Sequence, residues 1–234
     1  MTPHIAILGD FNPAYATHHA LNDSTRHLQT YLNEEIQFDW IATDTFHSRT
    51  VFQGTIPYKG LWIAPGSPYK DMENVLNIIS YARQNNVPTL GNCGGFQHIV
   101  IEFARTVCGI ANADHAETNP DTPDAVISKL SCSLVEQEER LSIADTSSLL
   151  YSIVQNTNIV GRYFCSYGIN PNYVETLQSN GLRFTAQSED GQMRAFELPS
   201  HPFFLGTLFQ PALSSTADSP NPILLAFVEK CLSL

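Results

Sequence analysis

The sequence predicts an α/β fold in which a mainly parallel sheet is covered by helices on both faces. In the first half of the chain, short apolar runs alternate with longer segments whose apolar residues recur at helical spacing. The short runs end in Gly, Asn, Asp or Pro, which are typical of turns. Such strand–helix units favour a parallel sheet, because helices form the crossovers between its strands. No linker or repeat divides the 234 residues, so we expect one domain over residues 1–234.

The first half supplies regular strand–helix alternation. The strand expected at Gly60–Ala64 stops at Pro65-Gly66-Ser67-Pro68, where two prolines surround a glycine turn. The helix expected at Glu73–Gln84 carries apolar residues three and four positions apart. The expected elements are strands at His4–Leu8, Ile36–Ile41, Gly60–Ala64 and Val87–Leu90, and helices at Ala14–Leu32, Glu73–Gln84 and Phe96–Val107.

The second half changes character after Gly109. Residues 112–124 are polar and loop-like, and the segments after them resemble strands joined by turns. A hairpin is expected around Ser188-Glu-Asp-Gly191, whose residues suit a tight turn. The expected elements are strands at Leu182–Gln187, Gln192–Leu198 and Leu205–Phe209, and a closing helix at Asn221–Leu232.

Charge and hydropathy disfavour several classes of partner. Twelve Lys and Arg against 23 Asp and Glu give a net charge of −11, which repels nucleic-acid phosphates and anionic lipid. No apolar run reaches the roughly 18 residues of a membrane span, and the N-terminal residues lack the pattern of a signal peptide. Five scattered cysteines without a CxxC pair argue against zinc and against a disulfide framework. We therefore expect a cytoplasmic protein with no cofactor, no metal, no nucleic-acid partner and no membrane association.

The most informative segment is Pro88-Thr-Leu-Gly-Asn-Cys-Gly-Gly-Phe-Gln97. An apolar strand delivers Cys93, flanked by glycines, to the start of a helix, as in a nucleophile elbow. A helix N-terminus lowers the pKa of a thiol, and the backbone N–H of Gly94 could stabilise an oxyanion. The alternative is that Cys93 is a small buried packing residue, which is the role expected of the other four cysteines.

Gly91-x-Cys93-x-Gly95-x-Gln97 resembles the nucleophile signature of class I glutamine amidotransferases, and the chain most resembles the glutaminase domain of CTP synthase. The resemblance implies the three-layer α/β fold of that family. It continues in order through Ile5-Ala-Ile-Leu-Gly9, the Pro65-Gly66 turn, Tyr81-Ala-Arg83, Ile101-Glu-Phe-Ala-Arg105, Arg162…Tyr167…Asn170, Gly181-Leu182, Ser188…Asp190-Gly191 and His201-Pro-Phe-Phe-Leu-Gly206.

The departures from the family pattern fall on its catalytic residues. Where the family has Phe-His-Pro-Glu, this chain has Phe209-Gln210-Pro211-Ala212. Gln210 cannot accept a proton at neutral pH, and Ala212 cannot orient a base. The family arginine that holds the α-carboxylate of glutamine corresponds to Ser166. Losing such a charge-assisted pair costs about 1.5–3 kcal/mol, which disfavours glutamine as the substrate.

Other features of the family pocket are retained. The Gly66-Ser67 turn corresponds to the loop that supplies the second oxyanion N–H, and Gln97 and Tyr167 are kept. Glu117 corresponds to the glutamate that contacts the amino group of glutamine. These residues imply a pocket for an amine-bearing molecule, or alternatively the incomplete decay of a dead site.

A replacement for the missing base would have to be another histidine. His115 is the best candidate, because its loop should border the pocket. His98 points away from Cys93, and His18 and His19 are expected on the solvated face of the first helix. A thiol can also react without a base if the helix terminus lowers its pKa enough.

Three functions remain open, and complete CTP synthesis is not expected because no GxxxxGK[ST] phosphate loop is present. The leading hypothesis is a stand-alone thiol enzyme that acts on a C–N, amide or ester-like bond of a small non-glutamine molecule. The alternatives are a glutaminase that supplies ammonia to a synthase-type partner, or a catalytically silent binding or regulatory subunit; a homo-oligomer is a further option. The residues assigned to catalysis are Cys93, Gly94, Gly66, Ser67 and His115, and those assigned to substrate binding are Gln97, Glu117, Ser166, Tyr167 and Gln210.

Overall fold

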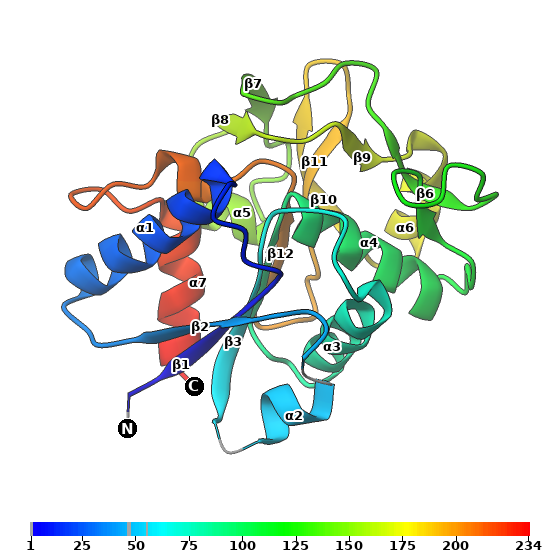
Figure 1. Ribbon diagram of the computed structural model, residues 1–234. Coiled ribbons are helices and arrows are strands. Elements are labelled where there is room, and N and C mark those ends of the chain that lie inside the picture. Colours follow the sequence, from blue (N-terminus) through cyan, green and yellow to red (C-terminus); the bar gives the residue numbers. More distant parts are fainter. Residues whose placement is uncertain (1, 46–47, 55) are drawn as a thin grey trace.

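A large mixed sheet forms the centre of the molecule. The structure is a computed structural model that describes residues 2–45, 48–54 and 56–234 (Figure 1). Among these residues the main sheet has nine strands in the order β2-β1-β3-β4-β12-β11-β10-β7-β8; the first five pair in parallel and the rest in antiparallel fashion. The strands are β1 His4–Leu8, β2 Gln37–Ile41, β3 Tyr58–Ile63, β4 Thr89–Asn92, β7 Gln137–Ser142, β8 Asn158–Tyr163, β10 Arg183–Ser188, β11 Met193–Glu197 and β12 Phe204–Thr207.

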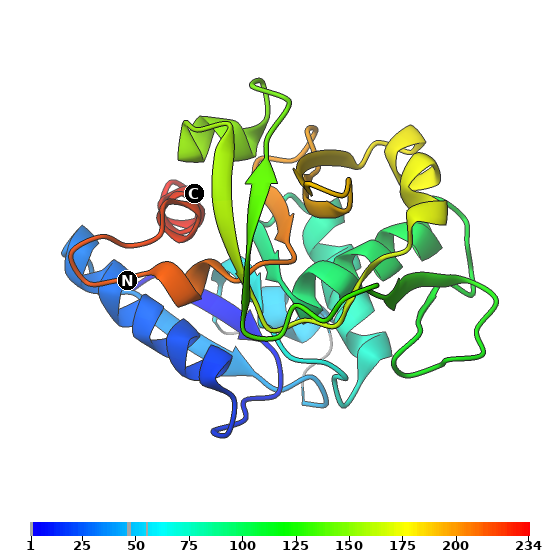
Figure 2. The ribbon, with the colours of Figure 1, turned by 90° about the horizontal axis from the view of Figure 1, so that it is seen from above.

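Helices cover both faces of the parallel part of this sheet, which gives three layers (Figures 1 and 2). On one face, α1 and α5 pack against α7; on the other face, α2 and α4 pack against α3. None of the described helices is both long and apolar enough to cross a membrane. The first group is α1 Ala16–Leu32, α5 Leu149–Val154 and α7 Pro222–Leu232; the second is α2 Ser48–Gln53, α3 Met72–Gln84 and α4 Gly94–Thr106.

A smaller sheet packs beside α4. It contains β5 Asp114–His115, β6 Ala125–Lys129 and β9 Tyr167–Ile169, in the order β5-β6-β9. The short helices η1 Pro171–Tyr173 and α6 Val174–Ser179 follow β9. Because β5 and β9 pair with the same strand, the loops beside them are held next to the start of α4.

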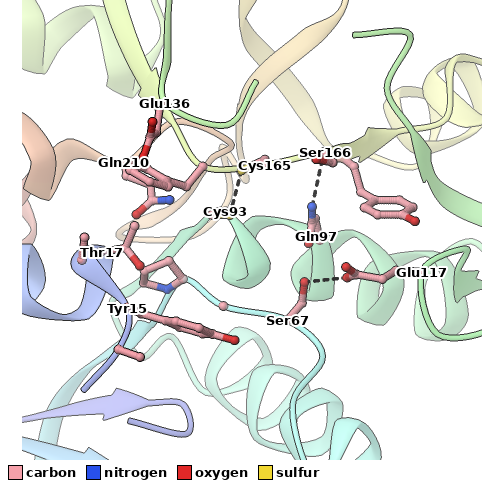
Figure 3. Close-up of a pocket in the computed structure, with 16 residues that line it drawn as sticks. Tyr15, Thr17, Ser67, Cys93, Gln97, Glu117, Glu136, Cys165, Ser166 and Gln210 are labelled. Carbon is pink, nitrogen blue, oxygen red and sulfur yellow. Dashed lines mark hydrogen bonds between the residues drawn. The ribbon is translucent and has the colours of Figure 1, made fainter. Parts of the chain in front are cut away.

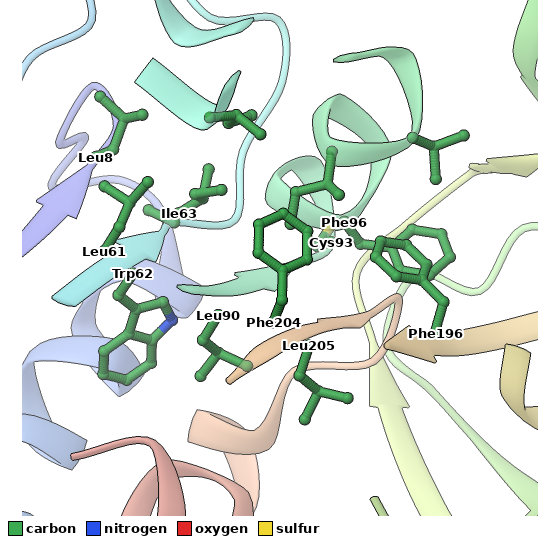
Figure 4. Packing of buried hydrophobic residues seen from close by; sticks show 14 of the residues in the cluster. Leu8, Leu61, Trp62, Ile63, Leu90, Cys93, Phe96, Phe196, Phe204 and Leu205 are labelled. Carbon is green, nitrogen blue, oxygen red and sulfur yellow. The ribbon is translucent and has the colours of Figure 1, made fainter. Parts of the chain in front are cut away.

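The hydrophobic core lies on both faces of the parallel strands, with α4 on one side and α7 on the other (Figure 4). Leu61, Trp62 and Ile63 of β3 and Phe96 of α4 are completely buried. Burying each such side chain contributes about 1.5–3 kcal/mol to folding. The only polar atom of the Trp62 side chain, Nε1, donates a hydrogen bond to Asn92 Oδ1 at 2.7 Å, so the core contains this indole without an unsatisfied donor.

The expected strands and long helices are present, with boundaries that differ by at most two residues. The main differences concern short elements, among them α2, which no pattern predicted. The segment 112–124, expected to be a loop, contains the two-residue strand β5, and the strand-rich second half also contains α5 and α6. A six-residue helix spans fewer than two turns, so it leaves almost no periodic signal. In α5 the local signal is its cap instead, because Ser148 Oγ accepts the Tyr151 N–H at 3.1 Å.

Candidate active site

The turn from β4 into α4 places Cys93 at the carboxyl end of a central strand of the sheet. Cys93 has φ 50° and ψ −106°, a conformation that a non-glycine residue rarely adopts and that a nucleophile elbow requires. Small neighbours are needed because the backbone is crowded. A Cβ at Gly95 would lie 2.5 Å from the Ile63 carbonyl oxygen, and one at Gly94 would lie 2.6 Å from the Gly66 carbonyl oxygen.

A buried polar network fixes the strand ends that carry the elbow. Asn92, at the end of β4, accepts from Trp62 and donates from Nδ2 to Thr207 Oγ1 at 2.8 Å. The Cys93 N–H donates to the Thr207 carbonyl oxygen at 3.0 Å. Thr207 Oγ1 in turn donates to the Phe209 carbonyl oxygen at 2.7 Å, next to Gln210. The same network therefore positions Cys93 and the segment that follows β12.

The elbow opens into a pocket of about 440 Å³ (Figure 3), within the range typical of small-molecule sites. Eight of the ten predicted site residues line it. The other two, Gly94 and His115, are not part of the lining, although the Gly94 backbone N–H donates to the Cys93 sulfur. The lining includes Tyr15, Thr17, Gly66, Ser67, Cys93, Gln97, Glu117, Glu136, Phe164, Cys165, Ser166, Tyr167 and Gln210.

The surroundings of Cys93 favour its thiolate. Its Sγ lies 2.7 Å from Cys165 Sγ, and the hydrogen bond from Cys165 is the largest cause of a lowered Cys93 pKa. Burial opposes this effect, while the backbone N–H groups of Gly66 and Gly94 reinforce it. The cause therefore differs in part from the expected one, because a second thiol contributes as well as the helix N-terminus.

Gln210 brings an unsatisfied amide to the pocket. Gln210 is only 3% exposed, and neither its Nε2 nor its Oε1 has a hydrogen-bond partner among the residues that the structure describes. Leaving such a buried group unpaired costs about 1–3 kcal/mol. Since Gln210 also lines the pocket, its amide offers one donor group and one acceptor to whatever occupies that space.

The lining is acidic. The carboxylates of Glu117 and Glu136 both belong to it, and none of its residues within the described chain is Lys, Arg or His. Glu117 is held in place by Ser67, whose hydroxyl donates to Glu117 Oε2 at 2.9 Å. Ser166, at the position where the family resemblance implies an arginine, contacts Ser133 through their hydroxyls at 3.0 Å. The pocket is therefore suited to a cation and not to an anion.

His115 holds two pocket residues instead of approaching Cys93. Its Nε2–H donates to Gln97 Oε1 at 3.1 Å, and its Nδ1 accepts the Glu117 N–H at 3.1 Å. Burial, assisted by the nearby His98, lowers the His115 pKa to about 3. With both ring nitrogens engaged in this way, His115 is a positioning residue, and the geometry gives no support to its expected role as a base.

The expectation that His18 faces solvent is wrong. His18 is 1% exposed; its Nε2–H donates to the Pro65 carbonyl oxygen at 2.8 Å and its Nδ1 accepts the Asn12 N–H at 2.9 Å. It therefore braces the turn that presents Gly66. His19, by contrast, is exposed as expected. Helical periodicity could not reveal this role, because the partner of His18 is 47 positions away.

Sequence reasoning also missed several pocket residues, among them Cys165 and Glu136. Cys165 was expected to be a packing residue, yet its sulfur contacts the candidate nucleophile. The only local signal was its position two residues before Tyr167, in a stretch already assigned to the pocket. Glu136 precedes β7 and has no motif around it. No cluster of three or more His, Cys, Asp or Glu in the described chain is arranged to hold a metal ion.

Comparison with known proteins identifies the family. The sequence profile of the class I glutamine amidotransferases matches residues 17–230. The chain belongs to this family. It is 32% identical over 237 residues to CTP synthase of Sulfurisphaera tokodaii, covering 96% of this chain, and 30% identical over 247 residues to that of Saccharolobus solfataricus, covering all of it. The chain spans 44% and 45% of the length of those two relatives, respectively.

Solved structures show the same fold. The glutaminase domain of Trypanosoma brucei CTP synthase with bound acivicin superposes with a TM-score of 0.86 at 24% identity, covering 99% of this chain and 94% of that one. A Thermoplasma acidophilum protein described as a putative GMP synthase subunit superposes with a TM-score of 0.66 at 16% identity, covering 100% of this chain and 96% of that one. The chain is therefore a homologue of the CTP synthase glutaminase domain.

Proposed function

We propose that this amidotransferase homologue is a thiol-dependent hydrolase or transferase that acts on an amide, C–N or ester-like bond of a small, amine-bearing molecule other than glutamine. The observation that carries the proposal is the position of Cys93. Its sulfur faces a pocket that contains two carboxylates and, among the described lining residues, no basic side chain. The backbone N–H groups of Gly66 and Gly94 point at the same sulfur.

The chemistry follows from these groups. The Cys93 thiolate adds to the carbonyl carbon, and the N–H groups of Gly66 and Gly94 stabilise the oxyanion. When the carbonyl re-forms, the leaving group departs and the acyl group remains on Cys93 as a thioester. Water, or an acceptor amine, then cleaves the thioester and returns the thiol.

The lack of an imidazole in the pocket bears on the bond that is cleaved. A leaving amine must be protonated as the C–N bond breaks, and the described lining offers no histidine to do so. An ester-like leaving group departs without that help. We therefore expect the activity to be greater on esters than on the corresponding amides.

The charge of the pocket indicates the substrate. Glu117 and Glu136 favour a cationic amine, and Ser166 offers no positive charge to an α-carboxylate. The free amide of Gln210 can donate to one substrate oxygen and accept from one N–H, which suits a carboxamide or a similar planar group. A ligand that makes these bonds removes the cost of the unpaired amide.

Matched chromogenic esters test this proposal. We expect the 4-nitrophenyl ester of a cationic amino acid to be hydrolysed at least about tenfold faster than that of an anionic acid of equal length, which corresponds to roughly 1.4 kcal/mol of charge preference. Cys93→Ser should abolish the turnover. The double variant Glu117→Gln, Glu136→Gln should remove the preference. The control Glu35→Gln should not, because Glu35 is exposed and does not line the pocket.

Glutamine supplies the contrasting measurement. Ammonia release should stay near background, since loss of a general base commonly costs about 10²–10⁴-fold. Glutamine turnover that depends on Cys93 would instead favour an ammonia-supplying glutaminase. Absence of Cys93-dependent turnover on every ester would favour the silent subunit.

A further inference from the structure

Two cysteine thiols lie next to each other in the lining of the pocket. Cys93 comes from the β4–α4 turn and Cys165 from the segment between β8 and β9, 72 positions later, and their sulfurs are 2.7 Å apart. Both are free thiols, and both line the pocket. The Cys165 thiol also contacts the Leu208 carbonyl oxygen at 3.4 Å. No step of the acyl chemistry above uses Cys165.

The two thiols differ in a way that assigns them different roles. The hydrogen bond from Cys165, with those from Gly66 and Gly94, lowers the Cys93 pKa. Burial raises the Cys165 pKa well above its ordinary value, and the hydrogen bond to Cys93 raises it further. One sulfur is thus prepared as a thiolate and its neighbour is kept as a thiol. A reactive thiolate next to a second, resolving thiol is the arrangement of redox-active cysteines.

The pocket gives a small oxidant access to this pair, whereas Cys132 is exposed on the surface outside the pocket. Cys93 is 7% exposed, toward a pocket that also admits solvent. Cys108, Cys132 and Cys231 do not line it. Cys231 is completely buried elsewhere, against β3 at Gly60.

We propose that Cys93 and Cys165 form a redox-active dithiol that reduces a small hydroperoxide and closes to an intramolecular disulfide. The Cys93 thiolate attacks the distal peroxide oxygen, forming Cys93–SOH, and the displaced alkoxide or hydroxide takes a proton from water. The Cys165 thiol then attacks the Cys93 sulfur, the S–O bond breaks, and water leaves with the thiol proton. The two sulfurs together lose two electrons, which the peroxide gains. An external dithiol restores both thiols by exchange.

The disulfide would also stop the acyl chemistry, because it consumes the nucleophile. This redox chemistry goes beyond the function proposed above and needs no acyl substrate. The two ideas can therefore fail separately.

Thiol counting on the full chain tests the pair. After treatment of the reduced protein with one equivalent of hydrogen peroxide at neutral pH, the denatured protein should titrate as three thiols instead of five. Mass spectrometry should find the Cys93 and Cys165 peptides joined, with the loss of two hydrogen atoms, and dithiothreitol should restore all the thiols. A free Cys93 after oxidation, or a Cys93–Cys132 link, would overturn the proposal.

Variants separate the two roles. In Cys165→Ser, and independently in Cys165→Ala, the Cys93 sulfenic acid should persist, react with dimedone and proceed to sulfinic acid with excess peroxide. Cys108→Ser is the matched control and should still lose two thiols with little dimedone adduct. Equal dimedone labelling in wild type and both Cys165 variants would contradict a resolving role. Loss of two thiols in Cys93→Ser would contradict the role of Cys93.

Discussion

Groups from separate parts of the chain converge on the sulfur of Cys93. Its strained backbone belongs to the elbow, but the groups that lower its pKa include Cys165 and Gly66, which lie far from it in sequence. Gly66 is presented by a turn whose Pro65 carbonyl oxygen accepts a hydrogen bond from the buried side chain of His18. We therefore expect the stability of the Cys93 thiolate to depend on the hydrogen bond from His18 to the Pro65 carbonyl oxygen.

Removing the His18 imidazole should raise the pKa of the Cys93 thiol, although His18 itself does not contact the Cys93 sulfur. In His18→Ala the Pro65 carbonyl loses its partner, the turn relaxes, and the Gly66 N–H no longer points steadily at the sulfur. One weakened charge-assisted hydrogen bond amounts to about one pKa unit. We expect the pH midpoint of Cys93 alkylation to rise by about that amount.

His19→Ala is the matched control, because His19 is the next residue and its ring contacts only the exposed Pro13 carbonyl oxygen at 2.8 Å among the hydrogen bonds of the described chain. The midpoint should not move in this variant. An unchanged midpoint in His18→Ala, with folding intact by circular dichroism, would show that the position of the Gly66 N–H does not depend on His18.

At the scale of elements, α4 is held by a buried ion pair as well as by the core. Arg83 of α3 binds Glu102 of α4 through two hydrogen bonds of 3.0 and 2.8 Å, and the Glu102 side chain is 1% exposed. The same two helices are joined near the surface by Arg105 and Glu73, whose side chain is 69% exposed. Both pairs connect the nucleophile helix to its neighbour, but the Arg83–Glu102 pair is buried with two hydrogen bonds and the Arg105–Glu73 pair has one bond to an exposed carboxylate.

We expect Glu102→Gln to cost about 3–5 kcal/mol of unfolding free energy, because it leaves a largely buried guanidinium without its charge partner. Glu73→Gln, at the exposed pair, should cost no more than about 1 kcal/mol. Urea unfolding of the two variants measures the difference. Equal losses would mean that the buried pair is compensated by solvent.

At the scale of the molecule, the packing around the site keeps histidines neutral. Burial lowers the pKa of His98 to about 4 and that of His115 to about 3. Both rings lie between α4 and the small sheet, where Asp114, Arg105, Tyr69 and Tyr167 also face them. Protonation of His115 would break the hydrogen bond in which its Nδ1 accepts the Glu117 N–H, whereas for His98 the cost of protonation is the burial of the charge.

These shifts predict acid sensitivity. The folded-state pKa values lie below the ordinary value of 6.5, so the stabilisation is complete above pH 6.5 and is lost as the pH falls toward 4 and 3. Each histidine should remove about 1.4 kcal/mol of unfolding free energy per pH unit in that range. Chemical unfolding between pH 7 and pH 4.5 measures the slope. His115→Asn should reduce this slope by about 1.4 kcal/mol per pH unit, which corresponds to the uptake of one proton. An unchanged slope would exclude His115 as a contributor.

The sequence by itself determined the strands and long helices of the first half, the Cys93 elbow and the resemblance to an amidotransferase, because these rest on local periodicity, glycine spacing and a continuous motif. It also predicted that Gly66, Gln97, Glu117 and Gln210 line one pocket, as they do in the structure. Only the tertiary structure decided that Cys165 contacts Cys93, that His18 is buried under the Pro65 turn, and that His115 supports Gln97 instead of the thiol. These contacts join loops from distant strands, and a loop conformation is set by what it packs against, which no local pattern records.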